Sequence, residues 1–194
     1  MYFVLFYHDL PYSEIEPVAP GLAVDVLSRF IDFYLLKIDT SVKKRNVQRF
    51  LDLLKNSDNI VSLWFRRAQP QELFNRLSEH CAVQKLIIKR PSSDLDFQFL
   101  FRLKHLVELH LDFSSLFPDN AFTDPIEPID FELIRRILEE LEFLFKFRLT
   151  YCDKKFEIQI GHSNSKRSFV VSCAFVLMVS ECSDPNTVIK FIKD

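Results

Sequence analysis

The stretch Leu106-Val107-Glu108-Leu109-His110-Leu111 sets the spacing that decides the fold, with apolar residues at its first, fourth and sixth positions. The same spacing recurs elsewhere in the chain, as Phe33-x-x-Leu36-x-Ile38, Ile60-x-x-Leu63-x-Phe65, Val83-x-x-Leu86-x-Ile88 and Leu144-x-x-Phe147-x-Leu149. Self-similarity at intervals of roughly 20 to 50 residues is typical of repeat architectures. Short apolar runs of this kind predict buried strands.

Helical patterns separate the copies of this motif, because apolar residues fall three and four positions apart. The expected helices lie at Val42–Leu54, at Gln71–His80 after Pro70, near Phe97–Lys104 after a capping Asp94 or Asp96, and from Phe131 after Asp130. Strands that alternate with helices predict parallel pairing through helical crossovers.

The pattern changes after Leu149 to a strict alternation of apolar and polar residues. Three alternating segments follow one another, at 147–151, 156–160 and 169–175, with short polar stretches between them. Such alternation predicts an antiparallel meander. The longest apolar stretch, Phe169 to Val179, is interpreted as a buried strand because it falls far short of the roughly 20 residues that a membrane span requires.

These patterns together predict an α/β fold: a curved solenoid of strand-helix units with parallel strands, closed by a C-terminal antiparallel β-meander. One domain is expected over residues 1–194, with an N-terminal cap at 1–32, irregular repeats at 33–150, and a meander and cap at 151–194. The segment Met1–Tyr7 is predicted to add a capping strand. An ordinary α/β domain built from the same strand-helix units is the alternative.

The strand half of the units resembles the leucine-rich-repeat superfamily over residues 33–150. The Asn that usually follows the strand in that superfamily is missing, since other residues stand at those positions: Ser41, Ala68, Pro91, Ser114 and Cys152. Irregular, Asn-poor units that end in hairpins also resemble the regions that follow the F-box in nematode F-box proteins. The resemblance implies a leucine-rich-repeat-like solenoid with a concave strand face that binds other proteins.

Composition removes several classes of function. The formal net charge of −2 gives no overall attraction to nucleic acid or to acidic membranes. Gly21 and Gly161 are the only glycines, so neither a phosphate-binding loop nor a dinucleotide fingerprint is present. The four cysteines have no zinc-ligand spacing and indicate reduced thiols. The N-terminus lacks a signal-peptide pattern, and a cytoplasmic or nuclear location is expected.

Placing the five motifs in register predicts rows of outward-facing residues on the concave face. The first row is Lys37, Trp64, Ile87, His110 and Arg148, and the second is Asp39, Arg66, Lys89, Asp112 and Thr150. Trp64, the single tryptophan, is expected to point away from the core, unless the N-terminal segment covers it or the register slips by one residue. The predicted partner-binding residues are Lys37, Trp64, Arg66, Ile87, Lys89, His110, Asp112 and Arg148.

A non-catalytic protein-protein interaction module, in the role of adaptor or substrate receptor, is the function expected from this face. A nucleic-acid-associated protein is the alternative, using the basic side formed by Arg66, Arg67, Lys89 and Arg90. The histidines are scattered without a nucleophile or metal-ligand spacing, so no catalytic residues, metal, cofactor, small-molecule substrate or membrane partner are expected. The polar insertion Leu116–Asp130 is predicted to be a surface loop.

Overall fold

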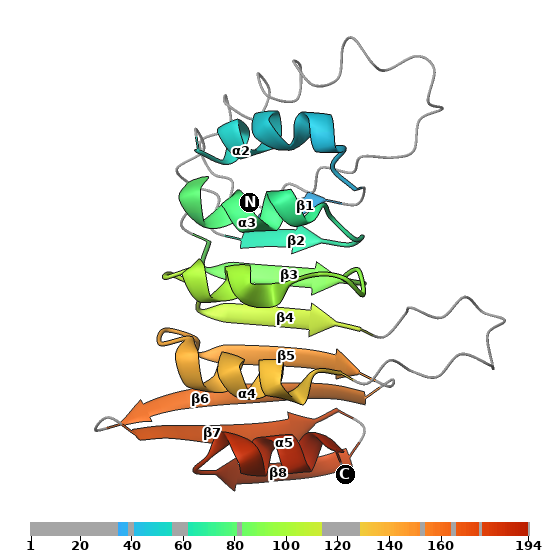
Figure 1. The fold of residues 1–194 in the computed structure, drawn as a ribbon. Coiled ribbons are helices and arrows are strands. Elements are labelled where there is room, and N and C mark those ends of the chain that lie inside the picture. Colours follow the sequence, from blue (N-terminus) through green and yellow to red (C-terminus); the bar gives the residue numbers. More distant parts are fainter. Residues whose placement is uncertain are drawn as a thin grey trace, which may run out of the picture.

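The strands form one sheet in which each strand lies beside its neighbour in the sequence (Figure 1). The computed structural model describes residues 35–38, 41–55, 62–80, 83–113, 129–151, 154–163, 166–174 and 176–193. The strands are β1 (Leu35–Ile38), β2 (Ser62–Phe65), β3 (Lys85–Lys89), β4 (Glu108–Asp112), β5 (Lys146–Tyr151), β6 (Lys154–Ser163), β7 (Lys166–Cys173) and β8 (Val176–Cys182). The predicted N-terminal cap and most of the insertion Leu116–Asp130 lie outside the described residues.

Strand direction divides the sheet at β5. The pairings from β1 to β5 are parallel, as the helical crossovers predict. The pairings from β5 to β8 are antiparallel, because short turns reverse the chain after each of these strands. β5 therefore accepts a parallel neighbour on one side and an antiparallel neighbour on the other.

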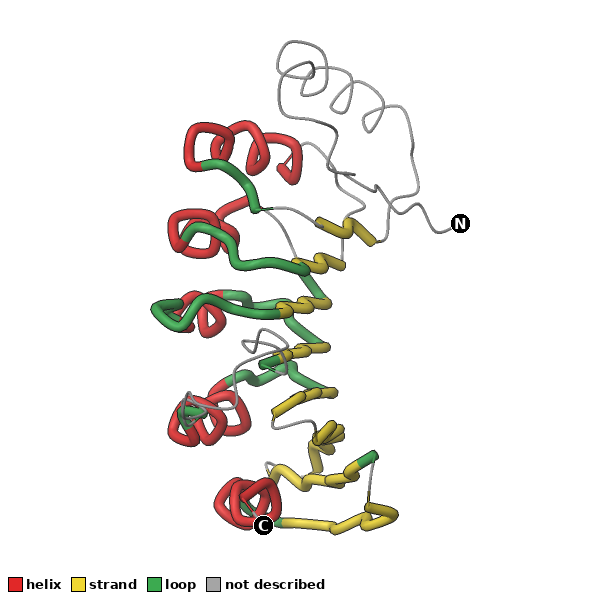
Figure 2. The backbone as a smooth tube through the Cα atoms, turned by 90° about the vertical axis from the view of Figure 1, so that its right-hand side faces the viewer, coloured by secondary structure: helices red, strands yellow, loops and turns green. Residues whose placement is uncertain are grey.

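All the described helices lie on one face of the sheet, and none of them lies on the other, open face (Figure 2). They are the 3-10 helix η1 (Lys44–Asn46), α2 (Val47–Lys55), α3 (Gln71–His80), the 3-10 helix η2 (Phe97–Arg102), α4 (Phe131–Glu140) and α5 (Pro185–Lys193). Asp130 caps α4, since its carboxylate accepts hydrogen bonds from the backbone N–H groups of Glu132 and Leu133. Asp96 caps η2 in the same way through Gln98.

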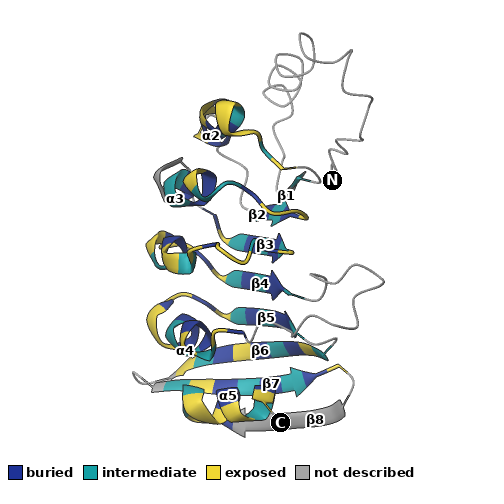
Figure 3. Cartoon of the chain, turned by 45° about the vertical axis from the view of Figure 1, so that its right-hand side comes forward, coloured by how far each residue is buried: buried dark blue, intermediate teal, exposed yellow. Residues whose placement is uncertain are grey.

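The core lies between the sheet and the helices (Figure 3). In the motifs of β2 to β5 the described apolar residues are buried, as in the pairs Leu86 with Ile88 and Leu109 with Leu111, whereas Ile38 of β1 is half-buried. Aromatic rings connect neighbouring units: the ring centroids of Phe65 and Phe74 are 5.4 Å apart, and those of Phe74 and Phe99 are 4.6 Å apart. This core positions the alternate residues of β2 to β7 on the opposite, open face.

The predicted curved, leucine-rich-repeat-like solenoid is wrong. The structure is a mixed sheet whose C-terminal end is antiparallel, with helices on one face, which agrees with an ordinary α/β domain. The physical reason is that the units are not equivalent: their crossovers contain α-helices in some places and a 3-10 helix in another. The Asn that would join neighbouring loops into a repeating turn is also absent from the sequence.

Individual elements also differ from the predictions. The helix expected near Phe97–Lys104 is a 3-10 helix. The apolar stretch Phe169–Val179 is not one strand, because β7 ends at Cys173 and β8 begins at Val176. The C-terminal helix α5 was not predicted, although Asp184 accepts a hydrogen bond from the Thr187 N–H at 3.0 Å at its start. The remaining predicted helices are present.

Candidate interaction surface

The predicted strand register is confirmed on the open face of the sheet. The backbone partners are Lys37 with Trp64, Trp64 with Ile87, Ile87 with His110, and His110 with Arg148. In β2 to β5 the residues beside this row are buried under the helices, so Trp64, Ile87, His110 and Arg148 point to the open face. The side chain of Lys37 lies outside the described residues. We define the open face by the described side chains Ser62, Trp64, Lys85, Ile87, Lys89, Glu108, His110, Asp112, Lys146, Arg148, Thr150 and Glu157.

Trp64 is half-buried on this face. Its Nε1 atom is buried, and the Lys89 Nζ lies 5.4 Å from the centroid of its ring. A cation over an indole ring is stabilising, most strongly where water is excluded. Trp64 therefore contributes to the stability of the free protein. Its strand partner Ile87 is also half-buried and extends the apolar centre toward β4.

The second predicted row is only partly formed. Lys89 and Asp112 are strand partners, and so are Asp112 and Thr150. Arg66 lies beyond the end of β2, where its backbone N–H donates to the Ile38 carbonyl at 3.0 Å, and its side chain is exposed. The pairing of β2 with β3 ends before Arg66, so Arg66 and Lys89 are not strand partners. Asp39 lies outside the described residues.

Ion pairs join neighbouring strands across the open face. The Lys85 Nζ lies 2.7 Å from a carboxylate oxygen of Glu108, and the Lys89 Nζ lies 3.6 Å from one of Asp112. In both pairs the two residues are also direct strand partners. Opposite charges in these positions stabilise a sheet, whereas like charges would destabilise it.

Glu157 on β6 connects two further cations. Its carboxylate oxygens lie 2.8 Å from the Lys146 Nζ and 2.8 Å from the Arg148 Nε. Burial acts to raise the pKa of Glu157, but the hydrogen bonds from Lys146 and Arg148 lower that pKa to about 2. Sequence reasoning missed Glu157 because the predicted rows stopped at Arg148. The alternation of Phe156 and Ile158, which are buried, is the signal that places Glu157 on the open face.

His110 lies between Ile87 and Arg148 in the confirmed row. Its Nε2 lies 3.3 Å from the Thr150 Oγ1, within hydrogen-bond distance. Burial lowers the pKa of His110, and the charges of Lys89 and Arg148 lower it further against an opposing effect of Asp112. The imidazole is therefore neutral at neutral pH.

The open face has only a shallow recess beside His110. A recess between β3, β4 and β5 has a volume of only about 10 Å³ and is lined by Lys85, Leu86, Ile87, Glu108, Leu109, His110, Lys146 and Arg148. A drug-sized ligand requires a pocket of about 300 Å³ or more. The geometry of this recess suits contact with a broad surface better than capture of a small molecule.

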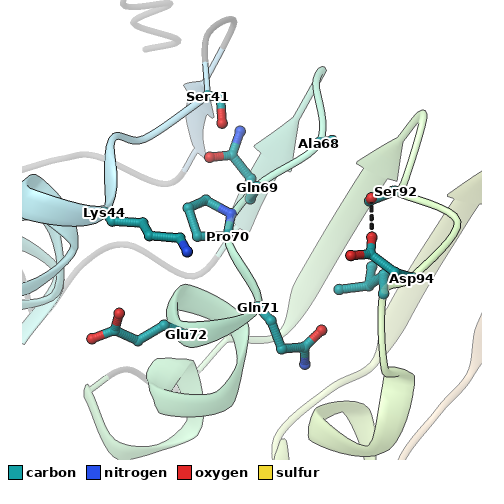
Figure 4. Close-up of a pocket in the computed structure, with 10 residues that line it drawn as sticks. Ser41, Lys44, Ala68, Gln69, Pro70, Gln71, Glu72, Ser92 and Asp94 are labelled. Atoms are coloured by element: carbon teal, nitrogen blue, oxygen red, sulfur yellow. Dashed lines mark hydrogen bonds between the residues drawn. The ribbon is translucent and has the colours of Figure 1, made fainter.

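A larger pocket of about 450 Å³ lies where the chain leaves the carboxyl ends of β1, β2 and β3 (Figure 4). Its lining contains the charged side chains of Lys44, Glu72 and Asp94, and Asp94 accepts a hydrogen bond from the Ser92 hydroxyl. Gln69 is buried at its wall, where its Oε1 accepts from the Val42 N–H at 2.8 Å. Sequence reasoning missed this pocket, although loops after parallel strands commonly form such crevices.

The described residues hold few groups suited to chemistry. No set of three His, Cys, Asp or Glu side chains among them is arranged to hold a metal ion. Cys173 is a free, buried thiol and Cys182 is also buried, whereas Cys81 and Cys152 lie outside the described residues. None of the helices in the described part of the chain is long and apolar enough to cross a membrane.

Comparison with known proteins gives no match: no protein-family model matches the chain, and neither does any of the curated proteins. The resemblance to the leucine-rich-repeat superfamily therefore stays a prediction, limited to the spacing of the strand motif.

Proposed function

We propose that this chain is a non-catalytic protein-protein interaction module that binds another protein through the open face, as an adaptor or substrate receptor. The observation that supports this proposal is the charge arrangement of the face. Lys85, Lys89, Lys146 and Arg148 each contact a carboxylate from a neighbouring strand. A surface with an apolar centre and a mixed polar surround matches the anatomy of protein interfaces.

The same arrangement disfavours a polyanion as the partner. Nucleic-acid binding draws on cations that release counterions from phosphates, and cations already held by carboxylates contribute less to that release. Lys89, which belongs to the basic side considered for nucleic acid, lies within ion-pair distance of Asp112. The apolar centre formed by Trp64 and Ile87 instead offers the type of residue that dominates protein-protein binding energy.

The proposed location is the cytoplasm or the nucleus. The free thiol of Cys173 supports it, because reducing compartments preserve such thiols. The proposed role requires no metal, cofactor or small-molecule substrate.

The proposal is tested by affinity capture with the intact chain as bait in a nuclease-treated cell extract. The open-face variant Trp64→Ala/Ile87→Ser is compared with Glu139→Ser, a substitution on the exposed side of α4. We expect a specific protein to be captured by the wild-type chain and by Glu139→Ser, and to be lost with the open-face variant. Circular dichroism of both variants verifies that they are folded.

Retention on a polyanion column tests the nucleic-acid alternative. If the chain binds nucleic acid, the wild-type protein should be retained on the column at low salt. Its affinity should then fall by several powers of ten over a severalfold rise in salt concentration. Such retention, together with loss of capture after nuclease treatment, would contradict the protein-partner proposal.

A further inference from the structure

Three large apolar side chains are exposed at the amino-terminal ends of β4 and β5. Val107, directly before β4, is 37% exposed, and Phe143 and Phe145, before β5, are 60% and 55% exposed. The two segments are adjacent, because the Val107 carbonyl accepts a hydrogen bond from the Phe145 N–H at 2.9 Å. We call these three residues the apolar lip. In the described part of the chain, every exposed large apolar residue belongs to it.

The backbone holds the apolar lip in place. The Val107 N–H donates to the Gln84 carbonyl at 2.7 Å, and the Phe145 carbonyl accepts from the Ile160 N–H at 2.8 Å. Leu144, between the two rings, is fully buried. The exposure of the rings is therefore a property of an anchored segment. Exposed apolar clusters of this kind mark interaction sites, because a partner that covers them removes apolar surface from water.

Charged residues flank the apolar lip on both sides, and the two sides differ in sign. Lys104 is exposed in the loop before β4. Glu142 is exposed in the loop between α4 and β5. Glu142 and Glu139 both interact electrostatically with Arg167, whose guanidinium also donates a hydrogen bond to the Leu138 carbonyl. Two carboxylates beside one guanidinium make the β5 side of the lip negative, whereas Lys104 makes the β4 side positive.

The described charges around the lip are thus balanced in number but separated in space. A surface of this kind does not select a strongly acidic or a strongly basic partner. It is instead complementary to itself, because a two-fold rotation brings the positive side of one copy to the negative side of the other. The same rotation places the apolar residues of both copies together in the middle. A second copy of the chain therefore satisfies both the apolar centre and the flanking charges.

We propose that the apolar lip is the interface of a symmetric dimer of this chain. In the dimer Phe143 and Phe145 of both copies pack together, and Lys104 of each copy faces Glu142 of the other. The two rings of one copy expose on the order of 200 Å², since an aromatic side chain has about 150–250 Å². A standard interface buries about 800 Å² on each partner. The lip therefore supplies the centre of a small interface, and the dimer should dissociate on dilution.

This inference goes beyond the proposed function, because it concerns a second copy of the chain and not the partner protein. The apolar centre of the open face, Trp64 on β2 and Ile87 on β3, lies outside the lip. A dimer formed through the lip carries two open faces. Two linked binding surfaces raise the avidity for a partner that has two matching sites, without any new contact.

Sedimentation velocity of the intact chain at increasing concentration tests the dimer. We expect the wild-type chain to change from monomer to dimer within the micromolar range. Phe143→Ser/Phe145→Ser should weaken this association about tenfold or more, because it removes the apolar centre of the interface. The control Lys190→Ser, at an exposed position on α5, should associate like the wild-type chain, and so should Trp64→Ala/Ile87→Ser. Circular dichroism verifies that each variant is folded.

Charge reversal tests the orientation of the two copies. Lys104→Glu places like charges opposite one another in the dimer, and so does Glu142→Lys. Each variant alone should therefore associate severalfold more weakly than the wild-type chain. An equimolar mixture of the two variants should recover the association, because both pairs across the interface then join opposite charges.

A wild-type chain that stays monomeric throughout the micromolar range would overturn the inference. Unchanged association in Phe143→Ser/Phe145→Ser would do the same, as would a mixture of the charge variants that associates no better than each variant alone. Dissociation by Trp64→Ala/Ile87→Ser, with no effect of the lip variant, would assign the dimer interface to the open face instead. These measurements use the chain alone, whereas the proposed function is tested by capture from the extract, so failure of one is distinguishable from failure of the other.

Discussion

Leu86 and Trp64 lie on adjacent strands but face opposite sides of the sheet. Leu86 is fully buried beneath the helices, whereas Trp64 is half-buried on the open face. Truncation of Leu86 removes buried methyl groups and leaves a cavity, while truncation of Trp64 removes a partly buried ring and its contact with Lys89. Substitutions at these two residues therefore distinguish an effect on folding stability from an effect on partner binding.

We expect Leu86→Ala to lower the free energy of unfolding by about 2–5 kcal/mol. Trp64→Ala should lower it by only about 1–2 kcal/mol, because the ring is half-buried. It should weaken partner binding by about 2 kcal/mol or more, as for aromatic hot spots. Urea titrations and calorimetric binding of the captured partner measure these quantities. A larger stability loss in Trp64→Ala than in Leu86→Ala would contradict the assigned directions of the two side chains.

His110 makes stability depend on pH. Its pKa is lowered in the folded protein, chiefly by burial, so the unfolded chain binds a proton more readily than the folded one. Stability from this group is complete above the unfolded value of about 6.5 and is lost as the pH falls through the lowered pKa.

We expect the urea midpoint of the wild-type chain to fall as the pH is lowered from about 7.5 to 5, in the range where histidine titrates. His110→Gln, which keeps a polar group near Thr150 and removes the titration, should reduce this slope. Exposed His105→Gln is the matched control and should retain the slope. Equal slopes in all three proteins would show that His110 is not the group responsible.

At the scale of elements, Asp130 fixes where α4 begins. Its carboxylate accepts hydrogen bonds from two backbone N–H groups that the helix itself cannot satisfy. We expect Asp130→Ala to lower the free energy of unfolding by about 1 kcal/mol, and Asp130→Asn to lower it less. Chemical denaturation followed by circular dichroism measures both. Equal stability of Asp130→Ala and the wild-type chain would remove this capping role.

The sequence predicts those elements whose apolar spacing is regular, and the strand register is the clearest case. The buried Leu and Phe positions of each motif fix the pairing, since a slip by one residue would turn Trp64 inward and Leu63 outward. The architecture was less predictable, because the same strand-helix spacing fits a solenoid and an ordinary α/β sheet. The loops, and not the strands, distinguish a solenoid from an ordinary α/β sheet. The Asn residues missing from these loops were the sequence signal against a solenoid.

In the candidate site, too, the residues that depend on regular strand spacing were predictable and the others were not. The row through Ile87 and His110 was predicted because it depends on strand register alone. Glu157 was missed because it comes from an antiparallel neighbour beyond the last motif. The exposed Phe143 and Phe145 were missed because apolar residues near a strand are expected to be buried, and only the three-dimensional exposure distinguishes them from Leu144.

At the scale of the molecule, the prediction of a single domain can be tested with Trp64. This single tryptophan reports on β2, whereas far-ultraviolet circular dichroism reports on all helices and strands. We expect the two signals to change together in a urea titration, because the described core is continuous from α2 to α5. A tryptophan transition at lower urea than the dichroism transition would show that the parallel half unfolds separately.

The sequential order of the strands has a consequence for synthesis. Each strand from β2 to β8 pairs with the one made just before it. Each pairing therefore spans one strand-helix unit or one hairpin and does not join distant parts of the chain. When a strand emerges from the ribosome, the strand with which it pairs has already been synthesised. The sheet can therefore form in order from β1 to β8. The change to antiparallel pairing after β5 shortens the last connections of the sheet, so β6, β7 and β8 can pair soon after they are synthesised.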